Sequence, residues 1–410
     1  RHNMADPIRT EPIGDVDDAT ALEPSQLGFM CGIEVHQQLA TGKLHSRQPG
    51  VLFDVTIDTV PVHWNRYHRR LRAARGEGGA IDIAARFETR RNRSFVYVQS
   101  PNSGLIELDE QPPLPHDEDA VSIALTVSAL LDAKPVTLLQ TMRKTVVDGS
   151  NTSGFQRTSL VSIDGVLQTE TGPVGVDVLC LEEDSARKLD TISTGDGEQV
   201  IYNLDRLGLP LIEIATAPDV QTPEHAKETS MALGRCLRQT RKVRRGLGSI
   251  RQDLNVSLAC GDRVEIKGCQ DLSWIPRIIR LEMARQLHFY RLANELRSLL
   301  SLPVLPPDRR SDDVTLEAEV AQAVEKHLPL ILEDVSTCFT SCESKMVQTG
   351  LKQDFTMLAL PLPGLAGKFG EKSSDKEGAQ MPRLGRELAG AAKLAGVKGV
   401  FHSDELPAYG

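Results

Sequence analysis

Aromatic side chains are scarce in this chain of 410 residues, at 4% of the total, and aliphatic residues supply nearly all of its 40% hydrophobic content. A core of Leu, Val, Ile and Ala is therefore expected, and broad aromatic stacking surfaces for single-stranded nucleic acid are not. The most apolar segment, residues 121–131, is too short and too rich in Ser and Thr to span a bilayer. Because no basic-then-apolar leader opens the chain, we predict a cytoplasmic protein without a membrane partner.

Cysteine is also sparse and irregularly placed. Of seven cysteines only Cys338 and Cys342 lie close together, and without a second pair or a nearby histidine they are weak evidence for zinc. A scattered, odd set of cysteines is typical of a reducing compartment.

Positive charge is in deficit, with a formal net charge of −9. This excludes a protein that holds a polyanion with its entire surface, so any contact with nucleic acid must be local. Two basic stretches, residues 66–75 and 238–245, are candidate phosphate contacts. The alternative, a solvated face, is the more common meaning of such a run.

The glycine-rich signatures of the common nucleotide-binding folds are missing. The sequence contains no Walker loop, no Rossmann glycine pattern, no kinase catalytic loop and no Gly-x-Ser-x-Gly elbow. Nucleotide chemistry in this chain would therefore depend on a metal held by carboxylates on a sheet.

Composition and periodicity divide the first three quarters of the chain. Residues 1–27 are acidic and rich in Pro, Asp and Thr, which predicts a disordered leader. Short alternating strands interleaved with helices follow, and residues 273–301 have a long helical pattern that Pro276 interrupts early. We assign residues 28–302 to one domain.

A second unit is predicted for residues 303–410. It begins with a linker at 303–310 that carries three prolines, followed by a helix near 316–328 and a strand near 355–360. A mixture of helices and strands in both units predicts the α+β fold class.

Two local patterns help to place the chemistry. Thr222 followed by Pro223 is a strong helix start, with a capping hydroxyl and proline at the first helical position. Residues 254–258 and 263–267 alternate apolar and polar side chains around a Cys-Gly-Asp turn, which predicts a β-hairpin with Asp253 at its polar face.

Three acidic segments are candidates for chemistry. In the first, residues 32–39 (GIEVHQQL), Glu34 and His36 stand two apart and share one face of a strand. A carboxylate beside an imidazole can ligate a divalent metal or move a proton. The alternative is a polar edge that faces solvent.

The second segment is Glu182, Glu183 and Asp184, at the end of an apolar run. Three successive carboxylates need solvent or a cation such as Mg²⁺, and an acidic turn is the alternative. The third is Glu213, which interrupts an apolar strand and needs a metal or a charged partner. An ion pair between Glu213 and Arg206 is the simpler explanation.

Together these segments resemble the B/E family of tRNA-dependent amidotransferase subunits. The motifs stand in the family's order between residues 29 and 272: GIEVHQQL (32–39), LIELDEQPP (105–113), LEED (181–184), NLDRLGLPLIEI (203–214), GSIRQDLNVSL (248–258) and VEIKG (264–268). HQQL and residues 148–158 (DGSNTSGFQRT) are similar to the archaeal E type, which is dedicated to Glu-tRNA(Gln).

The second unit has a resemblance of its own. Residues 360–370, 383–389 and 399–410 are similar to the insertion domain that the E-type protein shares with bacterial-type aspartyl-tRNA synthetases. The resemblance implies a cradle-like catalytic domain with a mixed or antiparallel sheet and helices, plus a smaller α/β insertion domain at 303–410. Because the chain ends within these motifs, we expect the domain to be truncated and the downstream helical and tail domains, with much of the tRNA grip, to be absent.

The resemblance also implies a reaction. ATP would phosphorylate the γ-carboxylate of glutamate on tRNA(Gln), and ammonia from an asparaginase-like partner subunit would displace the phosphate in a hetero-oligomer. His36, Glu183 and Glu213 match the family's Mg²⁺ ligands, with Glu34 and Asp253 as catalytic neighbours. Glu182 is the alternative ligand, because only one of the adjacent pair can face the site.

One departure from the family and two alternatives accompany this prediction. Residues 44–49 (LHSRQP) stand where many relatives have a zinc-binding cysteine cluster, so we predict no zinc there. The alternatives are a tRNA-binding protein without catalysis and a metal-dependent ligase that acts on a free amino acid. Retention of Glu34, Glu183 and Glu213 argues against the first, and the synthetase-like segment argues against the second.

Overall fold

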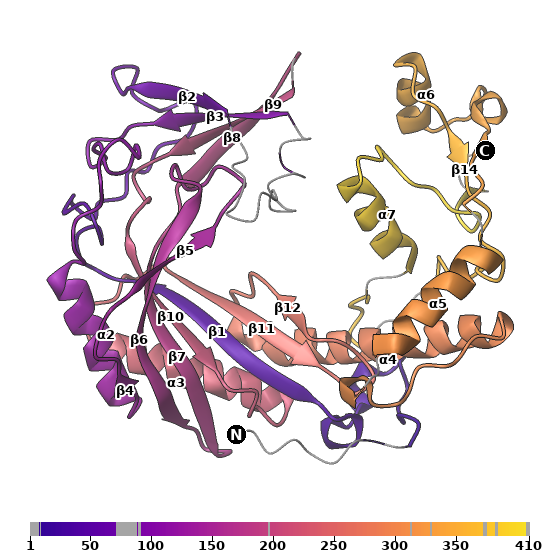
Figure 1. The fold of residues 1–410 in the computed structure, drawn as a ribbon, viewed down its shortest axis with the longest axis horizontal. Coiled ribbons are helices and arrows are strands. Elements are labelled where there is room, and N and C mark those ends of the chain that lie inside the picture. Colours follow the sequence, from indigo (N-terminus) through magenta and orange to yellow (C-terminus); the bar gives the residue numbers. More distant parts are fainter. Residues whose placement is uncertain are drawn as a thin grey trace.

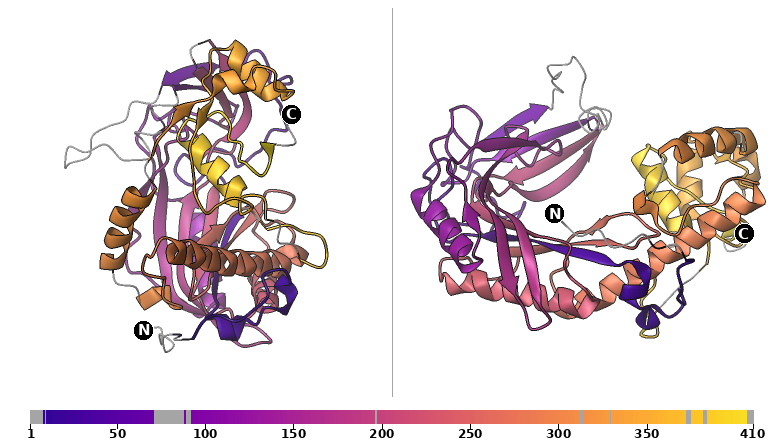
Figure 2. Two further views of the ribbon diagram at one scale, coloured as in Figure 1. Left: turned by 90° about the vertical axis from the view of Figure 1, so that its right-hand side faces the viewer. Right: turned by 60° about the horizontal axis from the view of Figure 1, so that its bottom comes forward.

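The structure is a computed structural model that describes residues 8, 10–70, 88, 92–195, 197–311, 314–328, 330–371, 375–381 and 384–406. Among the described residues, a large antiparallel sheet, a smaller mixed sheet and several helices make up most of the fold, and a smaller group of elements lies at one end of helix α4 (Ile275–Leu299) (Figures 1 and 2). The α+β class predicted from the sequence is confirmed.

The main sheet is antiparallel, with strand order β12-β11-β1-β10-β7-β6-β4 and with β5 also paired to β6. Its strands are β1 (Met30–Gln38), β4 (Lys134–Pro135), β5 (Thr141–Thr145), β6 (Phe155–Gln168), β7 (Pro173–Glu183), β10 (Pro210–Thr216), β11 (Ile250–Ser257) and β12 (Val264–Ile266). The predicted hairpin is confirmed as β11 and β12, in which Leu254 lies opposite Ile266.

One face of the main sheet packs against helices. These are α2 (Glu118–Leu130), α3 (Pro223–Gln239) and α4 (Ile275–Leu299), which lie along the sheet in Figure 2. Ile33, Ile212 and Leu254 from the strands share a buried core with Leu233 and Met283 from the helices. Because side chains alternate along a strand, this burial directs the intervening residues to the opposite face.

The helix starts follow from local chemistry. The Thr222 hydroxyl accepts a hydrogen bond from the backbone N–H of His225 at 3.0 Å, and Pro223 opens α3, so the predicted cap is confirmed. Pro276 does not interrupt the long helix, because it lies in the first turn of α4, where the missing N–H would have no helical partner.

The N-terminal segment packs against the protein. Residues 19–21 and 24–27 form the 3-10 helices η1 (Ala19–Ala21) and η2 (Pro24–Leu27), and Leu22 and Leu27 are buried in the main core. Arg291 donates hydrogen bonds to the carbonyls of Pro12 and Gly14. The prediction of disorder is therefore wrong for the described residues from 10 onward, since two leucines and an arginine from α4 anchor an otherwise polar segment.

A second, mixed sheet has the order β2-β3-β9-β8, with β3 and β9 parallel. Its strands are β2 (Arg66–Arg70), β3 (Arg93–Val98), β8 (Arg187–Thr194) and β9 (Gly197–Asn203). In the basic stretch 66–75, Arg69 donates to the Leu108 carbonyl and pairs with Glu110 at 2.8 Å, while residues 71–75 lie outside the described residues. Within 238–245, Arg238, Arg241, Lys242 and Arg245 are exposed at the end of α3 and just after it.

The C-terminal elements lie beyond α4 (Figure 1). They are α5 (Val314–His327), β13 (Glu333–Asp334), α6 (Lys345–Lys352), β14 (Leu358–Ala359) and α7 (Leu384–Leu394), together with short 3-10 turns η4 (Arg309–Ser311) and η5 (Ser336–Phe339). The helix predicted near 316–328 is confirmed, whereas the strand predicted near 355–360 is only the two residues of β14. Among the described helices, none has both the length and the hydropathy to cross a bilayer.

Candidate metal centre

The register of the central strands gathers acidic side chains on the face of the main sheet opposite the helices. His36 of β1 lies directly across from Glu213 of β10. Glu34 lies across from Asp253 of β11, on the other side of β1. Glu182 of β7, the strand beyond β10, projects from the same face. Cross-strand pairing thus assembles residues from four strands.

The His36 imidazole is the centre of this group. Its Nε2 lies 3.4 Å from Glu34, 3.5 Å from Glu182 and 3.8 Å from Glu213. Two sets of three residues place one possible ligand atom each within 4.8 Å of one another: Glu34, His36 and Asp253, and His36, Glu182 and Glu213. Burial lowers the pKa of His36, so the neutral imidazole that binds metals is favoured. Nitrogen and carboxylate ligands of this kind suit a divalent cation.

Lys144 neutralises the two innermost carboxylates. Its Nζ lies 2.9 Å from Glu182 and 2.8 Å from Glu213. The alternative explanation, an ion pair between Glu213 and Arg206, is wrong, because Arg206 instead donates to the backbone carbonyls of Ser185 and Ala186. Sequence reasoning missed Lys144, which stands 69 residues before Glu213 in an exposed strand without any distinguishing pattern.

The two innermost carboxylates differ in their electrostatics. Glu182 is 1% exposed, and burial together with the neighbouring Glu213 raises its pKa to about 8. For Glu213, burial acts in the same upward direction, but hydrogen bonds from Glu182 and Lys144 outweigh it and lower the pKa. The pKa values of the two carboxylates are thus displaced in opposite directions, as expected where two acidic groups lie close together.

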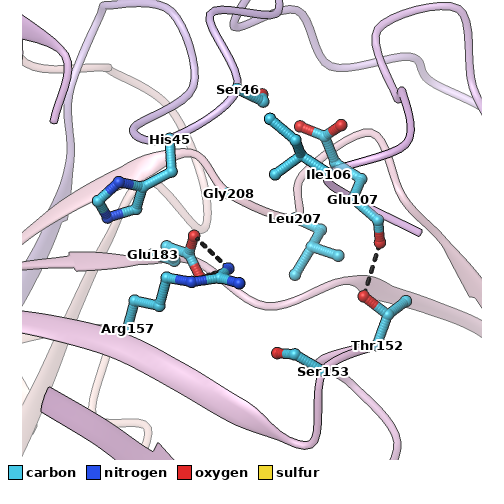
Figure 3. Close-up of a pocket in the computed structure, with 10 residues that line it drawn as sticks. All are labelled: His45, Ser46, Ile106, Glu107, Thr152, Ser153, Arg157, Glu183, Leu207 and Gly208. Carbon is cyan, nitrogen blue, oxygen red and sulfur yellow. Dashed lines mark hydrogen bonds and ion pairs between the residues drawn. The ribbon is translucent and has the colours of Figure 1, made fainter. Parts of the chain in front are cut away.

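Glu183 is not part of this cluster. It is the next residue along β7, so its side chain projects from the other face, where Arg157 lies 3.1 Å away. Figure 3 shows this pair beside a small cavity that Glu107, Thr152 and His45 also line. The structure thus brings His36 and Glu213 together with Glu182, and the expectation that Glu183 joins them is corrected by the strand register.

A buried lysine lies near that cavity and was also missed. Lys43 is fully buried, donates to the Leu204 carbonyl at 3.1 Å and lies 3.7 Å from Glu107. Burial lowers its pKa to about 8, although the charge of Glu107 opposes the change. No local pattern distinguishes Lys43 from a surface lysine in the sequence.

The outer end of the cluster is closed by the hairpin. Lys267 of the loop after β12 lies 3.2 Å from Asp253 and 2.7 Å from Glu265. Burial, followed by the charges of Glu213, Glu265 and Asp253, raises the pKa of Glu34. Since Asp253 lies across from Glu34 and contacts Lys267, it stands on the polar face of the hairpin, as the alternation of residues predicted.

Comparison with known proteins finds a matching family and several similar proteins. Residues 29–329 match the family described as the GatB/GatE catalytic domain. The chain is 43% identical over 389 residues to the E-type subunit of glutamyl-tRNA(Gln) amidotransferase from Methanocaldococcus jannaschii and 42% identical over 386 residues to that from Pyrococcus furiosus. Each alignment covers 94% of this chain and 55% of the relative, so the chain spans about half the length of the curated relatives it matches.

Proposed function

The chain belongs to the GatB/GatE catalytic domain family, and from this premise we propose that it carries the ATP-dependent amidation site of a glutamyl-tRNA(Gln) amidotransferase. ATP phosphorylates the γ-carboxylate of glutamate attached to tRNA(Gln). Ammonia then displaces the phosphate and leaves glutamine on the tRNA. The observation that carries this proposal is the cluster of His36, Glu182 and Glu213 within the part of the chain that matches the family.

We propose that His36, Glu182 and Glu213 hold Mg²⁺, with the second group of Glu34 and Asp253 sharing His36. The donor set supports this, because it combines a neutral imidazole with two carboxylates that otherwise depend on Lys144 for neutralisation. When bound, the ion would offset the negative charge of the phosphates, which is a large part of catalysis in phosphoryl transfer. The register favours Glu182 over Glu183 as the ligand.

The remaining side chains of the cluster support the amidation step. Ammonia that attacks an acyl phosphate must lose a proton as the amide forms. Glu34 is the candidate acceptor, because its carboxylate lies at the outer part of the cluster and its pKa is raised above the ordinary value. Asp253, directly across from it, is the candidate for orienting the incoming group.

A partner is part of the proposal. The relatives are named as subunits, which supports an assembly, and an asparaginase-like chain would supply the ammonia. We further propose that residues 303–410 form a domain similar to the insertion domain of aspartyl-tRNA synthetase and contact the tRNA. The reaction would take place in the cytoplasm, where charged tRNA is used.

The decisive test measures ATP hydrolysis and Gln-tRNA formation with Glu-tRNA(Gln), using ammonium chloride in place of the partner. Hydrolysis that depends on Glu-tRNA(Gln), with amide formed on the tRNA, is the expected result. Activity with free glutamate would favour the metal-dependent ligase. Binding of Glu-tRNA(Gln) without hydrolysis, with and without an asparaginase-like partner, would favour the non-catalytic alternative and refute the proposal.

A further inference from the structure

Lys144 places its ammonium group where the two innermost carboxylates converge. The Nζ lies within hydrogen-bonding distance of Glu182 and Glu213, at 2.9 and 2.8 Å, and donates to one oxygen of each. These two residues are also members of the His36 cluster. At Glu213 the ammonium contacts Oε2, the same oxygen that lies nearest His36, so it competes there with a divalent ion, whereas Glu182 turns its other oxygen, Oε1, toward His36.

The strand that carries Lys144 allows the ammonium to leave. All five residues of β5 are exposed, and within the described part of the chain β5 pairs only with β6, off the main path of the sheet. The Lys144 side chain itself is 43% exposed. A lysine is a flexible four-carbon stem with a hydrated point charge at its end, so it can move into solvent without disturbing the fold.

The carboxylates, in contrast, are held in place. Glu182 is 1% exposed, and the Thr158 hydroxyl donates to it at 3.2 Å. Glu213 lies within a buried strand whose neighbours Ile212 and Ile214 belong to the core. A buried carboxylate without a counter-charge is costly, so some cation must stay with this pair whenever it is ionised.

We propose that Lys144 is an exchangeable counter-ion, which neutralises Glu182 and Glu213 while the site has no divalent ion and is displaced when one binds. The inference rests on the metal centre proposed above. It gives Lys144 a regulatory role, because competition by the ammonium sets the metal concentration at which the site loads. It also keeps the ligands in position between one metal ion and the next.

The change in metal affinity when the Lys144 charge is removed separates an exchangeable counter-ion from a lysine that stays beside the metal. If the ammonium competes with the metal, then removing it tightens metal binding. If Lys144 instead remains beside the metal and supports its ligands, removing it weakens binding. Charge-assisted hydrogen bonds are strong enough that loss of the competitor should tighten binding by about tenfold or more.

The test is calorimetric titration of the full chain with Mn²⁺ and with Mg²⁺, without nucleotide. Lys144→Met should bind both ions about tenfold more tightly than wild type, and Lys144→Arg, which keeps the charge, should not. Lys134→Met is the matched control, since Lys134 is 74% exposed on the same sheet and pairs only with the exposed Asp164 among described residues. Its metal affinity should equal that of wild type.

Thermal unfolding of the same variants gives a second readout. Lys144→Met should unfold at a lower temperature than wild type without metal and should gain more from added Mg²⁺. If Lys144→Met does not fold, Lys144→Gln is measured in its place, because it also removes the positive charge. If the wild type binds metal through Glu213 but Lys144→Met and Lys144→Gln bind it no more tightly, the exchange role of Lys144 is refuted while the proposed metal centre is retained. Absence of metal binding in wild type and all variants overturns both.

Discussion

Replacement of Glu213 by glutamine separates the role of this residue in metal binding from any role in folding. In the wild type, Lys144 contacts Glu213 at 2.8 Å and Glu182 at 2.9 Å. At an effective dielectric constant of about 20, a unit charge pair at either distance is worth roughly 6 kcal/mol. Glu213→Gln removes one pair, but it also removes the charge that helps to raise the pKa of Glu182.

Glu182 should then ionise and replace Glu213 as the partner of Lys144. Lys144 lies at nearly equal distances from the two carboxylates, so its attraction to Glu182 substitutes for its attraction to Glu213. Because Lys144 is half-exposed, solvent screens the remaining difference between the two ion pairs. The free energy of unfolding should therefore change by less than about 1 kcal/mol. Urea unfolding followed by circular dichroism measures this quantity directly.

Metal binding should respond very differently. Loss of outer partners of a metal site typically weakens binding by about 10- to 100-fold, so loss of a ligand should cost at least about 100-fold. We expect this weakening in a Mg²⁺ titration, and a loss of amide formation on Glu-tRNA(Gln) with ammonium chloride as the nitrogen source. Glu118→Gln, a charge change at an exposed residue of α2, is the control. Near-normal metal affinity and amidation in Glu213→Gln would refute the assignment of Glu213 as a ligand.

Three further outcomes are expected. Glu182→Gln should weaken Mg²⁺ binding, whereas Glu183→Gln should leave Mg²⁺ affinity near wild type. Glu183→Gln should instead lower the free energy of unfolding by about 3 kcal/mol or more, because Arg157 loses its buried partner. Metal titration and urea unfolding of both variants test this, and weaker Mg²⁺ binding in Glu183→Gln with normal binding in Glu182→Gln would contradict it. The pKa of Lys43 is about 8 in the folded protein against 10.5 when exposed. Between these pH values the unfolded chain binds more protons than the folded one, so rising pH favours the folded state. The free energy of unfolding of the wild type should therefore increase by about 3 kcal/mol between pH 8 and pH 10.5. Lys43→Met should lack this gain in urea unfolding across that range, and an identical pH profile would contradict it. Thr222→Ala should lower the stability of the protein by about 1 kcal/mol, because α3 loses its cap, and an unchanged unfolding midpoint would show that the cap is dispensable.

Local patterns were enough to predict several elements of the fold. The start of α3 depends on Thr222 and Pro223, which are adjacent in sequence, and the hairpin of β11 and β12 depends on alternation around one short turn. The shared face of Glu34 and His36 follows from the same alternation within β1. Each of these features involves side chains a few residues apart, so their geometry is set by the backbone itself.

Short-range patterns failed where distant contacts outweighed composition. The acidic segment before β1 has the composition of a disordered leader, yet Leu22 and Leu27 find a place in the core that α4 helps to build. The segment expected to form a strand near 355–360 is mostly irregular, since within the described parts of the chain it pairs only with the two residues of β13. Pairing partners and a core to pack against are properties of the folded chain, not of the segment.

Alternation along each strand identifies the side chains available for the candidate metal centre, because it assigns each one to a face of its strand. Which of those faces meet depends on how the strands pair in the folded chain. Pairing of β10 with β1 and β7 places Glu213 beside His36 and Glu182, turns Glu183 toward Arg157, and brings Lys144 from 69 residues away. The physical reason is that a shift of one residue in strand register would exchange the two faces, and burial of the apolar face against α3 and α4 selects the register that leaves the carboxylates together.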